Sequence, residues 1–183
     1  MSFPAAAPDL KDRTLIINGA SKGYAMTGWR LGFGAGPKWL ITAIGKLLSQ
    51  STTCPSSISQ ATAVAAFDGD QTPVKAMARL YKARRDLMIN LLTGIPSLTY
   101  TVPEGTFYVF VNVQGLLGKK TPTGVTLDSD GDVVRYWLEQ AGVATVLGEA
   151  YGISPYVRLS FASGEKMIEE GCARIRQACE ALI

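Results

Sequence analysis

The sequence predicts a mixed α/β protein built from two unlike parts that a long helix joins. Up to about Phe67, short apolar or glycine-rich runs alternate with helical patterns, as at the end of a larger α/β unit. After about Gly94, three strand patterns alternate with two helical patterns, which is typical of a compact α+β domain. We therefore expect the remnant of a large domain at residues 1–72, a linking helix at 73–93 and a small α+β domain at 94–183.

The first part contains two predicted strands and two predicted helices. Leu15–Ile17 and Leu31–Ala35 are short runs between turn-forming residues, which favours buried strands of a covered sheet. Pro37 fits the first turn of a helix over "KWLITAIGKLLSQ", and a further helix is predicted over Ser57–Phe67. Two strands and two helices make a poor sheet, so we expect that the amino-terminal part of this domain is absent.

A long amphipathic helix is predicted from Pro73 to Leu92, where apolar residues recur at three-and-four spacing. Beyond it, alternation predicts strands at Phe107–Val113, Val143–Leu147 and Tyr156–Ala162.

Two helices complete the second part. One is predicted over Asp132–Gln140, with Gly142 as its carboxy-terminal stop. The last runs from Gly164 to the terminus, with Ser163 as its predicted cap. One face of this last helix carries a set of apolar residues, namely Met167, Ile168, Cys172, Ile175, Cys179 and Leu182. The two cysteines are two turns apart, too far for a disulfide, so we interpret them as core residues.

Composition excludes several classes of function. The 183 residues are 47% hydrophobic and 18% charged, which favours a folded core over disorder. Histidine is absent, so histidine triads and histidine general bases are excluded. Three cysteines with no C-x-x-C spacing leave few ligands for zinc, and we expect a reduced, cytoplasmic protein with no metal.

Charge and hydropathy give no sign of a nucleic-acid or membrane partner. The net charge is +3, and the dense basic run Lys82–Asp86 lies within a helical pattern, where we interpret it as a solvated face rather than a nucleic-acid patch. The amino terminus lacks the pattern of a signal peptide, and no apolar run approaches membrane-spanning length. We therefore expect a soluble protein.

The stretch "INGASKGYAMTGWRLGF" places a lone lysine, Lys22, in a turn of small residues, with Arg30 eight positions later. A lysine at the end of a buried strand can be desolvated, which favours its neutral amine, a nucleophile toward an aldehyde. Pyridoxal phosphate is carried as an imine of this kind, and Arg30 and the Ser21 hydroxyl could bind its phosphate. The alternative is an ordinary surface lysine in a glycine-containing turn, with Arg30 as an ion-pair partner.

A second arginine lies in the predicted strand "YVRLSFA". Alternation puts Val157, Leu159 and Phe161 on one face and Arg158 with Ser160 on the other, so a rigid strand holds Arg158 opposite the core. A fixed guanidinium suits bidentate binding of a carboxylate. The alternative is an arginine on an edge strand that faces solvent.

These motifs resemble a known family. "NGASKGYAMTGWRLGFGAGP" resembles the lysine segment of class I, fold-type I pyridoxal-phosphate aminotransferases, in particular the bacterial aspartate and prephenate aminotransferase branch, with its pattern S-K-x-[FY]-[AG]-M-x-G-x-R-x-G. The resemblance continues through "SQSTTCP", "EGTFYVFVNV" and "VRLSFA", and it covers essentially the whole chain.

The resemblance implies roles for the residues discussed above. Lys22 is then the Schiff-base lysine, which moves a proton between the substrate's α-carbon and the cofactor's C4′. Arg30 binds the cofactor phosphate, with Ser21 as an additional donor, and Arg158 binds the substrate α-carboxylate. The implied activity is transfer of an amino group between an L-amino acid, aspartate or a related one, and a 2-oxo acid. Members of the family are homodimers.

Some positions depart from the family pattern. Gly19 stands where some members have a phosphate-binding serine, Leu147 where proline is frequent and Thr106 where alanine is usual. Family members are also about twice as long as this chain, so we expect a carboxy-terminal fragment with little activity alone. The amino-terminal half supplies the partner of the pyridinium nitrogen and most of the phosphate cup. An alternative is the aminotransferase-like sensor domain of a transcription regulator, which carries a helix-turn-helix module before this fold.

Overall fold

The computed structural model describes residues 3–183, and these form two compact units. Unit 1 ends at Ala76, and unit 2 extends from Met77 to Ile183. The elements that begin in unit 1 are α1 (Phe3–Ala6), η1 (Pro8–Arg13), β1 (Ile16–Gly19), α2 (Ala20–Gly23), η2 (Thr27–Trp29), β2 (Gly32–Ala35), α3 (Lys38–Gln50), α4 (Ser57–Asp68) and α5 (Thr72–Leu92).

Strands β1 and β2 form an antiparallel pair in which Asn18 is opposite Phe33 and Gly19 is opposite Gly32. Both strands were predicted within a few residues, but their predicted burial is wrong. Every residue of β2 is exposed, and the side chain of Ile17 in β1 is 79% exposed. The apolar runs identify the strands correctly, whereas burial also needs a covering layer, and α3 and α4 cover this pair only in part, through contacts such as that of Phe67 with Phe33.

Helices α3 and α4 confirm the predictions from helical spacing. Pro37 is the N-cap residue of α3, next to the position that the sequence suggested, and α4 ends one residue beyond the predicted Phe67. The apolar face of α3 is largely uncovered, with Trp39 69% and Leu47 73% exposed. Helical periodicity therefore specifies α3 even though little packs against it.

The predicted long helix is α5, which has 21 residues, and its end is held within unit 2. Arg176 donates hydrogen bonds to the carbonyl oxygens of Leu91, Thr93 and Gly94, at 2.8, 3.1 and 3.4 Å. The last carbonyls of a helix have no partner within the helix, so a guanidinium there satisfies them and complements the helix dipole.

The sheet of unit 2 has four antiparallel strands in the order β3-β4-β6-β5. Phe110 of β4 is opposite Arg158 of β6, which in turn is opposite Val146 of β5. The first strand was not predicted, and β5 is shorter than its predicted range. The elements of unit 2 after α5 are β3 (Thr99–Tyr100), β4 (Tyr108–Asn112), η3 (Gln114–Leu116), α6 (Asp130–Ala141), β5 (Val146–Leu147), η4 (Gly148–Tyr151), β6 (Tyr156–Ser160) and α7 (Glu165–Glu180).

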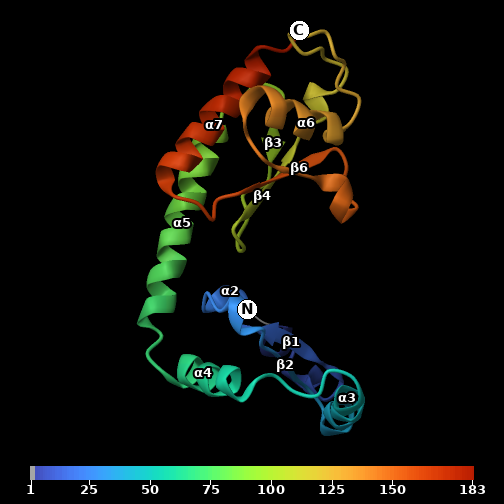
Figure 1. The fold of residues 1–183 in the computed structure, drawn as a ribbon, viewed down its shortest axis with the longest axis vertical. Coiled ribbons are helices and arrows are strands. Elements are labelled where there is room, and N and C mark those ends of the chain that lie inside the picture. Colours follow the sequence, from blue (N-terminus) through green and yellow to red (C-terminus); the bar gives the residue numbers. More distant parts are fainter. Residues whose placement is uncertain (1–2) are drawn as a thin grey trace. The chain divides into compact units, whose positions relative to one another are not determined.

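One face of this sheet carries the core of unit 2. Alternate residues of β4 and β6 are buried there, and they pack with side chains from α5, α6 and α7. The ribbon shows these helices beside the sheet of unit 2 (Figure 1). Trp137 of α6 has no exposed surface, and Phe161 after β6 is 1% exposed. Successive side chains of a strand point to opposite faces, so the residues between the buried ones lie on the other face of the sheet. The three helices of this core do not cover that face.

Helix α6 begins two residues before the predicted Asp132, after a Ser129 cap that was not predicted, and it ends at the predicted stop, Gly142. The Ser129 hydroxyl accepts a hydrogen bond from the Asp132 N–H at 3.2 Å and donates to the Asp132 carboxylate at 2.8 Å. This second bond is the main reason that the pKa of Asp132 lies below its usual value. At the other end Gly142 adopts φ +64°, the left-handed conformation typical of a helix stop.

Helix α7 corrects two predictions. Its N-cap is Gly164, and no side chain caps it, so the predicted role of Ser163 is wrong. Met167 was assigned to the buried face but is 68% exposed. The predicted core cysteines are confirmed: burial raises the pKa of Cys172 to about 11 and that of Cys179 to about 12, and both thiols are free.

The basic run of α5 makes ion pairs within the helix and one hydrogen bond to the loop after β3. Lys82 makes an ion pair with Asp86 at 2.9 Å, and Arg85 bonds both Asp86 and the carbonyl oxygen of Pro103. The Lys82 side chain is 67% exposed, in keeping with a solvated helix face.

Candidate active site

Lys22 lies in α2, the single helical turn that follows β1 directly. The N–H of Ala20, a fully buried residue, donates to the carbonyl oxygen of Leu31 at 3.4 Å. A Cβ at Gly19 would lie 3.1 Å from that same oxygen, so glycine permits the close approach of the two chain segments. Lys22 itself is exposed, and Ser21 beside it is half-buried. Residues 3–183 therefore do not bury the Lys22 amine to the extent that the sequence led us to expect.

The turn between Lys22 and Arg30 has an unusual backbone. Ala25 and Arg30 have φ values of +54° and +51°, in the left-handed region that residues other than glycine seldom adopt. Arg30 follows η2, and its Nη1 donates to the carbonyl oxygen of Thr27 at 2.9 Å. Strained positions of this kind cluster at functional sites, so the conformation supports a functional interpretation of Arg30.

Helix α4 holds this turn in place. The hydroxyl of Ser59, which is 6% exposed, donates to the carbonyl oxygen of Trp29 at 2.8 Å, directly before Arg30. The Phe67 ring meets the rings of Tyr24 and Phe33 edge-on, with centroids 5.1 and 5.6 Å apart. Through these contacts, α4 holds both the segment after Lys22 and the segment before Arg30.

Arg158 lies in β6, on the face of the sheet opposite the core of unit 2. Strand β6 has β4 on one side and β5 on the other, so the alternative of an edge-strand arginine is wrong. Arg158 is half-buried, and its guanidinium lies against the rings of Tyr108 and Tyr151. A central strand gives this arginine the rigid support that the sequence predicted.

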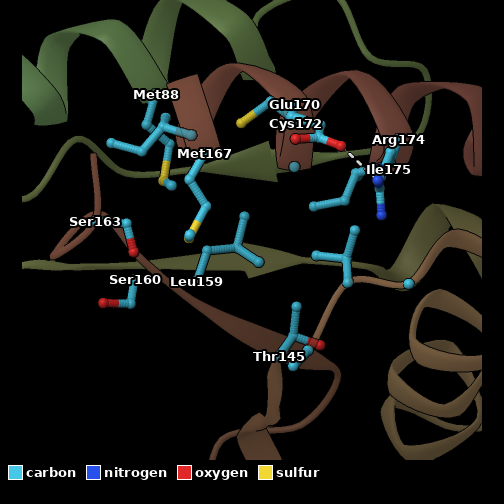
Figure 2. A pocket seen from close by; sticks show the side chains of 15 residues that line it. Met88, Thr145, Leu159, Ser160, Ser163, Met167, Glu170, Cys172, Arg174 and Ile175 are labelled. Atoms are coloured by element: carbon cyan, nitrogen blue, oxygen red, sulfur yellow. Dashed lines mark hydrogen bonds and ion pairs between the residues drawn. The ribbon is translucent and has the colours of Figure 1, made fainter. Parts of the chain in front are cut away.

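A cavity of about 430 Å³ opens in unit 2, and it is lined mainly by residues of the core side of the sheet and of α7, together with Ser160 at the end of β6. Figure 2 shows Leu159 of β6, Met167 and Cys172 of α7 and Thr145 from the loop before β5 around this space. By strand alternation Leu159 points away from the face of Arg158. None of the predicted site residues lines this cavity.

The structure thus groups the predicted residues by unit. Ser21, Lys22 and Arg30 lie within one turn of unit 1, and Arg158 lies in unit 2. Sequence analysis did not single out the two tyrosines beside Arg158. Alternation within "FYVFVNV" could have placed Tyr108 on the face of Arg158, whereas no pattern signals Tyr151, since it lies in a turn.

The match to a family model gives these residues a context. The model described as aminotransferase class I and II matches residues 2–175, so the chain belongs to this family, whose members depend on pyridoxal phosphate. The chain is 49% identical over 175 residues to the aspartate aminotransferase of Rhizobium meliloti (strain 1021), with 96% of this chain and 43% of that protein covered. The probable aspartate/prephenate aminotransferase of Rhizobium leguminosarum bv. phaseoli is 44% identical over 174 residues, which are 95% of this chain and 44% of that protein.

Solved structures agree with this assignment. The crystal structure of the aspartate aminotransferase from Rhizobium meliloti matches with a TM-score of 0.95 at 46% identity, covering 100% of this chain and 46% of that one. The aromatic aminotransferase from Pyrococcus horikoshii OT3 matches with a TM-score of 0.80 at 33% identity, covering 93% of this chain and 44% of that one. The predicted family and fold class are confirmed, and the regulator alternative is not favoured.

Two further facts bear on the wider expectations. The chain spans about 43–44% of the length of the curated relatives that it matches. None of the helices formed by residues 3–183 combines the length and apolar content needed to cross a bilayer.

Proposed function

We propose that the protein containing this chain is a pyridoxal-phosphate-dependent aminotransferase. It transfers an amino group between an L-amino acid, aspartate or a related one, and a 2-oxo acid. The observation that carries this proposal is the 49% identity, over 175 residues, to a protein named aspartate aminotransferase. Because the chain spans only 43% of that relative, we assign the activity to the whole protein rather than to these residues alone.

The donor set of unit 1 fits a phosphorylated aldehyde. Lys22, an exposed residue, offers an amine and Ser21 a hydroxyl. Arg30 offers a guanidinium of which one N–H is donated to the carbonyl oxygen of Thr27, so that further N–H groups can meet an anion. Lys22 would hold the cofactor through Nζ, and Arg30 with Ser21 would hold its phosphate. When bound, pyridoxal phosphate supplies a carbonyl that accepts the amino group and a ring that delocalises the electrons left at the substrate's α-carbon.

The remaining roles follow from the chemistry of the side chains. Once the substrate amine had displaced it from the cofactor, the Nζ atom of Lys22 would be a free amine that could take the proton from the substrate's α-carbon and later return a proton, as a general base and acid. Arg158 holds the substrate α-carboxylate through paired N–H donors, which orients the α-carbon.

We assign residues 1–72 to the large cofactor-binding domain, 73–93 to a linking helix and 94–183 to the small domain of a cytoplasmic homodimer.

The role of Lys22 can be tested on the chain itself. The purified protein is mixed with pyridoxal phosphate and reduced with borohydride, and the modified residue is mapped by peptide mass spectrometry. We expect the label at Lys22, its loss in Lys22→Ala and its retention in Lys46→Ala, a matched change at another exposed lysine. Labelling spread evenly over the lysines would contradict a specific role for Lys22.

A kinetic test addresses the activity. The product of the intact reading frame is assayed with a panel of amino donors and 2-oxo acid acceptors, with aspartate expected among the preferred donors. Lys22→Ala should lower kcat by about 10²–10⁴-fold, the usual contribution of a positioned proton carrier. Full activity of Lys22→Ala, or no transfer from any donor, would overturn the proposal.

A further inference from the structure

The guanidinium of Arg158 lies against two tyrosine rings that come from different elements. Its Cζ is 4.1 Å from the ring centroid of Tyr108 and 4.8 Å from that of Tyr151. Tyr108 is in the neighbouring strand β4, and Tyr151 ends the η4 turn. Both distances are well within the range of about 6 Å over which a cation and an aromatic face attract each other.

The rings hold the cation without using its hydrogen-bond donors. Among residues 3–183, Arg158 has no hydrogen bond and no ion pair, and its recorded partners are these two rings. A carboxylate partner would occupy the paired N–H groups that an incoming oxyanion needs, whereas a ring attracts the cation through its π-electrons. The N–H groups of Arg158 therefore stay available for a ligand.

The turn that carries Tyr151 is itself firmly positioned. The N–H of Glu149 donates to the carboxylate of Asp130, a residue 1% exposed at the start of α6, at 3.1 Å. A Cβ at Gly148 would lie 2.6 Å from the carbonyl oxygen of Tyr156 and closer still to that of Ile153, so this position accepts only glycine.

The ring of Tyr151 also has a direct support on the sheet. Phe110, directly opposite Arg158 in the register, meets this ring edge-on, with centroids 5.7 Å apart and planes at 87°. Tyr151 is therefore held at its backbone by the turn and at its ring by Phe110, and it can keep Arg158 in one orientation.

We propose that Tyr108 and Tyr151 are positioning residues, which orient the Arg158 guanidinium for a carboxylate while leaving its N–H donors available. This inference rests on the proposed role of Arg158 as the carboxylate-binding residue. It adds that the aromatic rings, rather than an acidic partner, prepare this arginine. The relevant property is the ring and not the phenol, because the structure records no hydrogen bond from either tyrosine hydroxyl among residues 3–183.

A spectroscopic test measures the ring contacts directly. In the ¹⁵N-arginine-labelled chain, the Nε–Hε signal of Arg158 is assigned by its loss in Arg158→Lys. We expect a ring-current shift of this signal in the native chain and in Tyr108→Phe and Tyr151→Phe, which keep a ring. Tyr108→Leu and Tyr151→Leu should each lose part of the shift, and Tyr156→Leu, at a tyrosine of β6 not found against Arg158, should retain it.

A binding test connects the rings to the carboxylate. Maleate, a dicarboxylate probe, is titrated into the holoenzyme made from the intact reading frame, and the Kd is followed through the cofactor absorbance. Each leucine variant should raise the Kd about fivefold, as expected for the loss of one cation–π contact, and each phenylalanine variant should stay within about twofold. Steady-state kinetics should show the change mainly in KM.

The outcomes separate this inference from the proposed function. If Arg158→Lys leaves the maleate Kd unchanged, the proposed role of Arg158 is wrong, whatever the tyrosine variants do. If Arg158→Lys weakens maleate binding and the leucine variants do not, the role of Arg158 stands and the ring inference is overturned. Leucine variants that move the NMR signal but leave the Kd unchanged overturn it as well, since the rings would then touch Arg158 without preparing it.

Discussion

Units 1 and 2 treat similar apolar side chains in opposite ways. In unit 2, Trp137 and Leu92 are at most 1% exposed, because three helices pack on one face of a four-stranded sheet. In unit 1, Ile17, Trp39 and Leu47 are 69–79% exposed on a two-stranded sheet and an amphipathic helix. Apolar periodicity thus specifies which face of an element is to be covered, while the covering itself depends on a second layer.

The same contrast separates the candidate residues of unit 1 from Arg158 of unit 2. Arg158 lies on a central strand whose other face is a closed core, and aromatic rings hold it. Lys22 and Arg30 lie in a turn that depends on a few contacts from α4, chiefly the Ser59 hydrogen bond and the Phe67 ring. The first arrangement resists local change, and the second should be sensitive to it.

The strongest test of this contrast exchanges matched tryptophans. Trp137→Ala should lower the free energy of unfolding by about 3–5 kcal/mol, because it leaves a cavity in a closed core. Trp39→Ala removes the same side chain from an exposed helix face and should change it by less than about 0.5 kcal/mol. Urea unfolding followed by far-UV circular dichroism measures both, and equal losses would contradict the contrast in packing.

The buried thiols of unit 2 should make its stability fall at high pH. Burial raises the pKa of Cys172 to about 11 and that of Cys179 to about 12, above the value of about 8.5 of a free thiol. The folded state then binds more protons than the unfolded state between these values, so the contribution of each thiol is complete below pH ~8.5 and declines as the pH rises. Each thiol should cost up to about 1.4 kcal/mol per pH unit in that interval.

Chemical denaturation between pH 8 and 11 measures this decline. Cys172→Ala and Cys179→Ala should each give a shallower pH dependence than the native chain, and Cys54→Ala, at the exposed cysteine, should leave it unchanged. Identical slopes in all four proteins would show that the buried thiols do not cause the decline.

Two serines near helix starts distinguish a real cap from an apparent one. Ser129→Ala should destabilise unit 2 by about 1 kcal/mol, since Ser129 caps α6. Ser163→Ala should have almost no effect, because no side chain caps α7. Thermal melts of the two variants give the comparison, and a larger loss for Ser163→Ala would contradict the assignment of the caps.

The smallest expected effect is local to unit 1. Ser59→Ala removes the hydrogen bond to Trp29, so amide exchange around Arg30 should become about fivefold faster, as expected for a bond worth roughly 1 kcal/mol. Thr62→Ala, which removes a hydroxyl that donates to the carbonyl oxygen of Ile58 within α4, is the matched control. Equal exchange rates in both variants would show that α4 does not hold the turn.

Local patterns predicted most of the elements. Helices α3 to α7 and strands β1, β2, β4 and β6 were found within a few residues, because each has its own periodicity or turn residues. The predictions that failed needed information from elsewhere in the chain. The two-residue strand β3 exists only through its pairing with β4, and the exposure of Met167 depends on which turns of α7 the sheet covers.

The candidate site follows the same rule. Ser21, Lys22, Arg30 and Arg158 could be named from their neighbours in the sequence and from resemblance. The exposure of Lys22 could not, since it depends on what lies around the turn. The rings beside Arg158 could not be predicted either, because one comes from the strand register and the other from a turn that a buried aspartate holds.

Because of the left-handed backbone at Arg30, selection for stability and selection for the proposed activity should favour different residues at this position. At φ +51°, the backbone conformation costs glycine about 1 kcal/mol less free energy than arginine, and asparagine also tolerates it. A library randomised at position 30 and sorted only for folded protein should therefore drift toward glycine and asparagine. If Arg30 binds the cofactor phosphate as proposed, the same library placed in the whole protein and sorted for amino transfer should keep arginine, and the two outcomes would together measure the stability lost for that guanidinium.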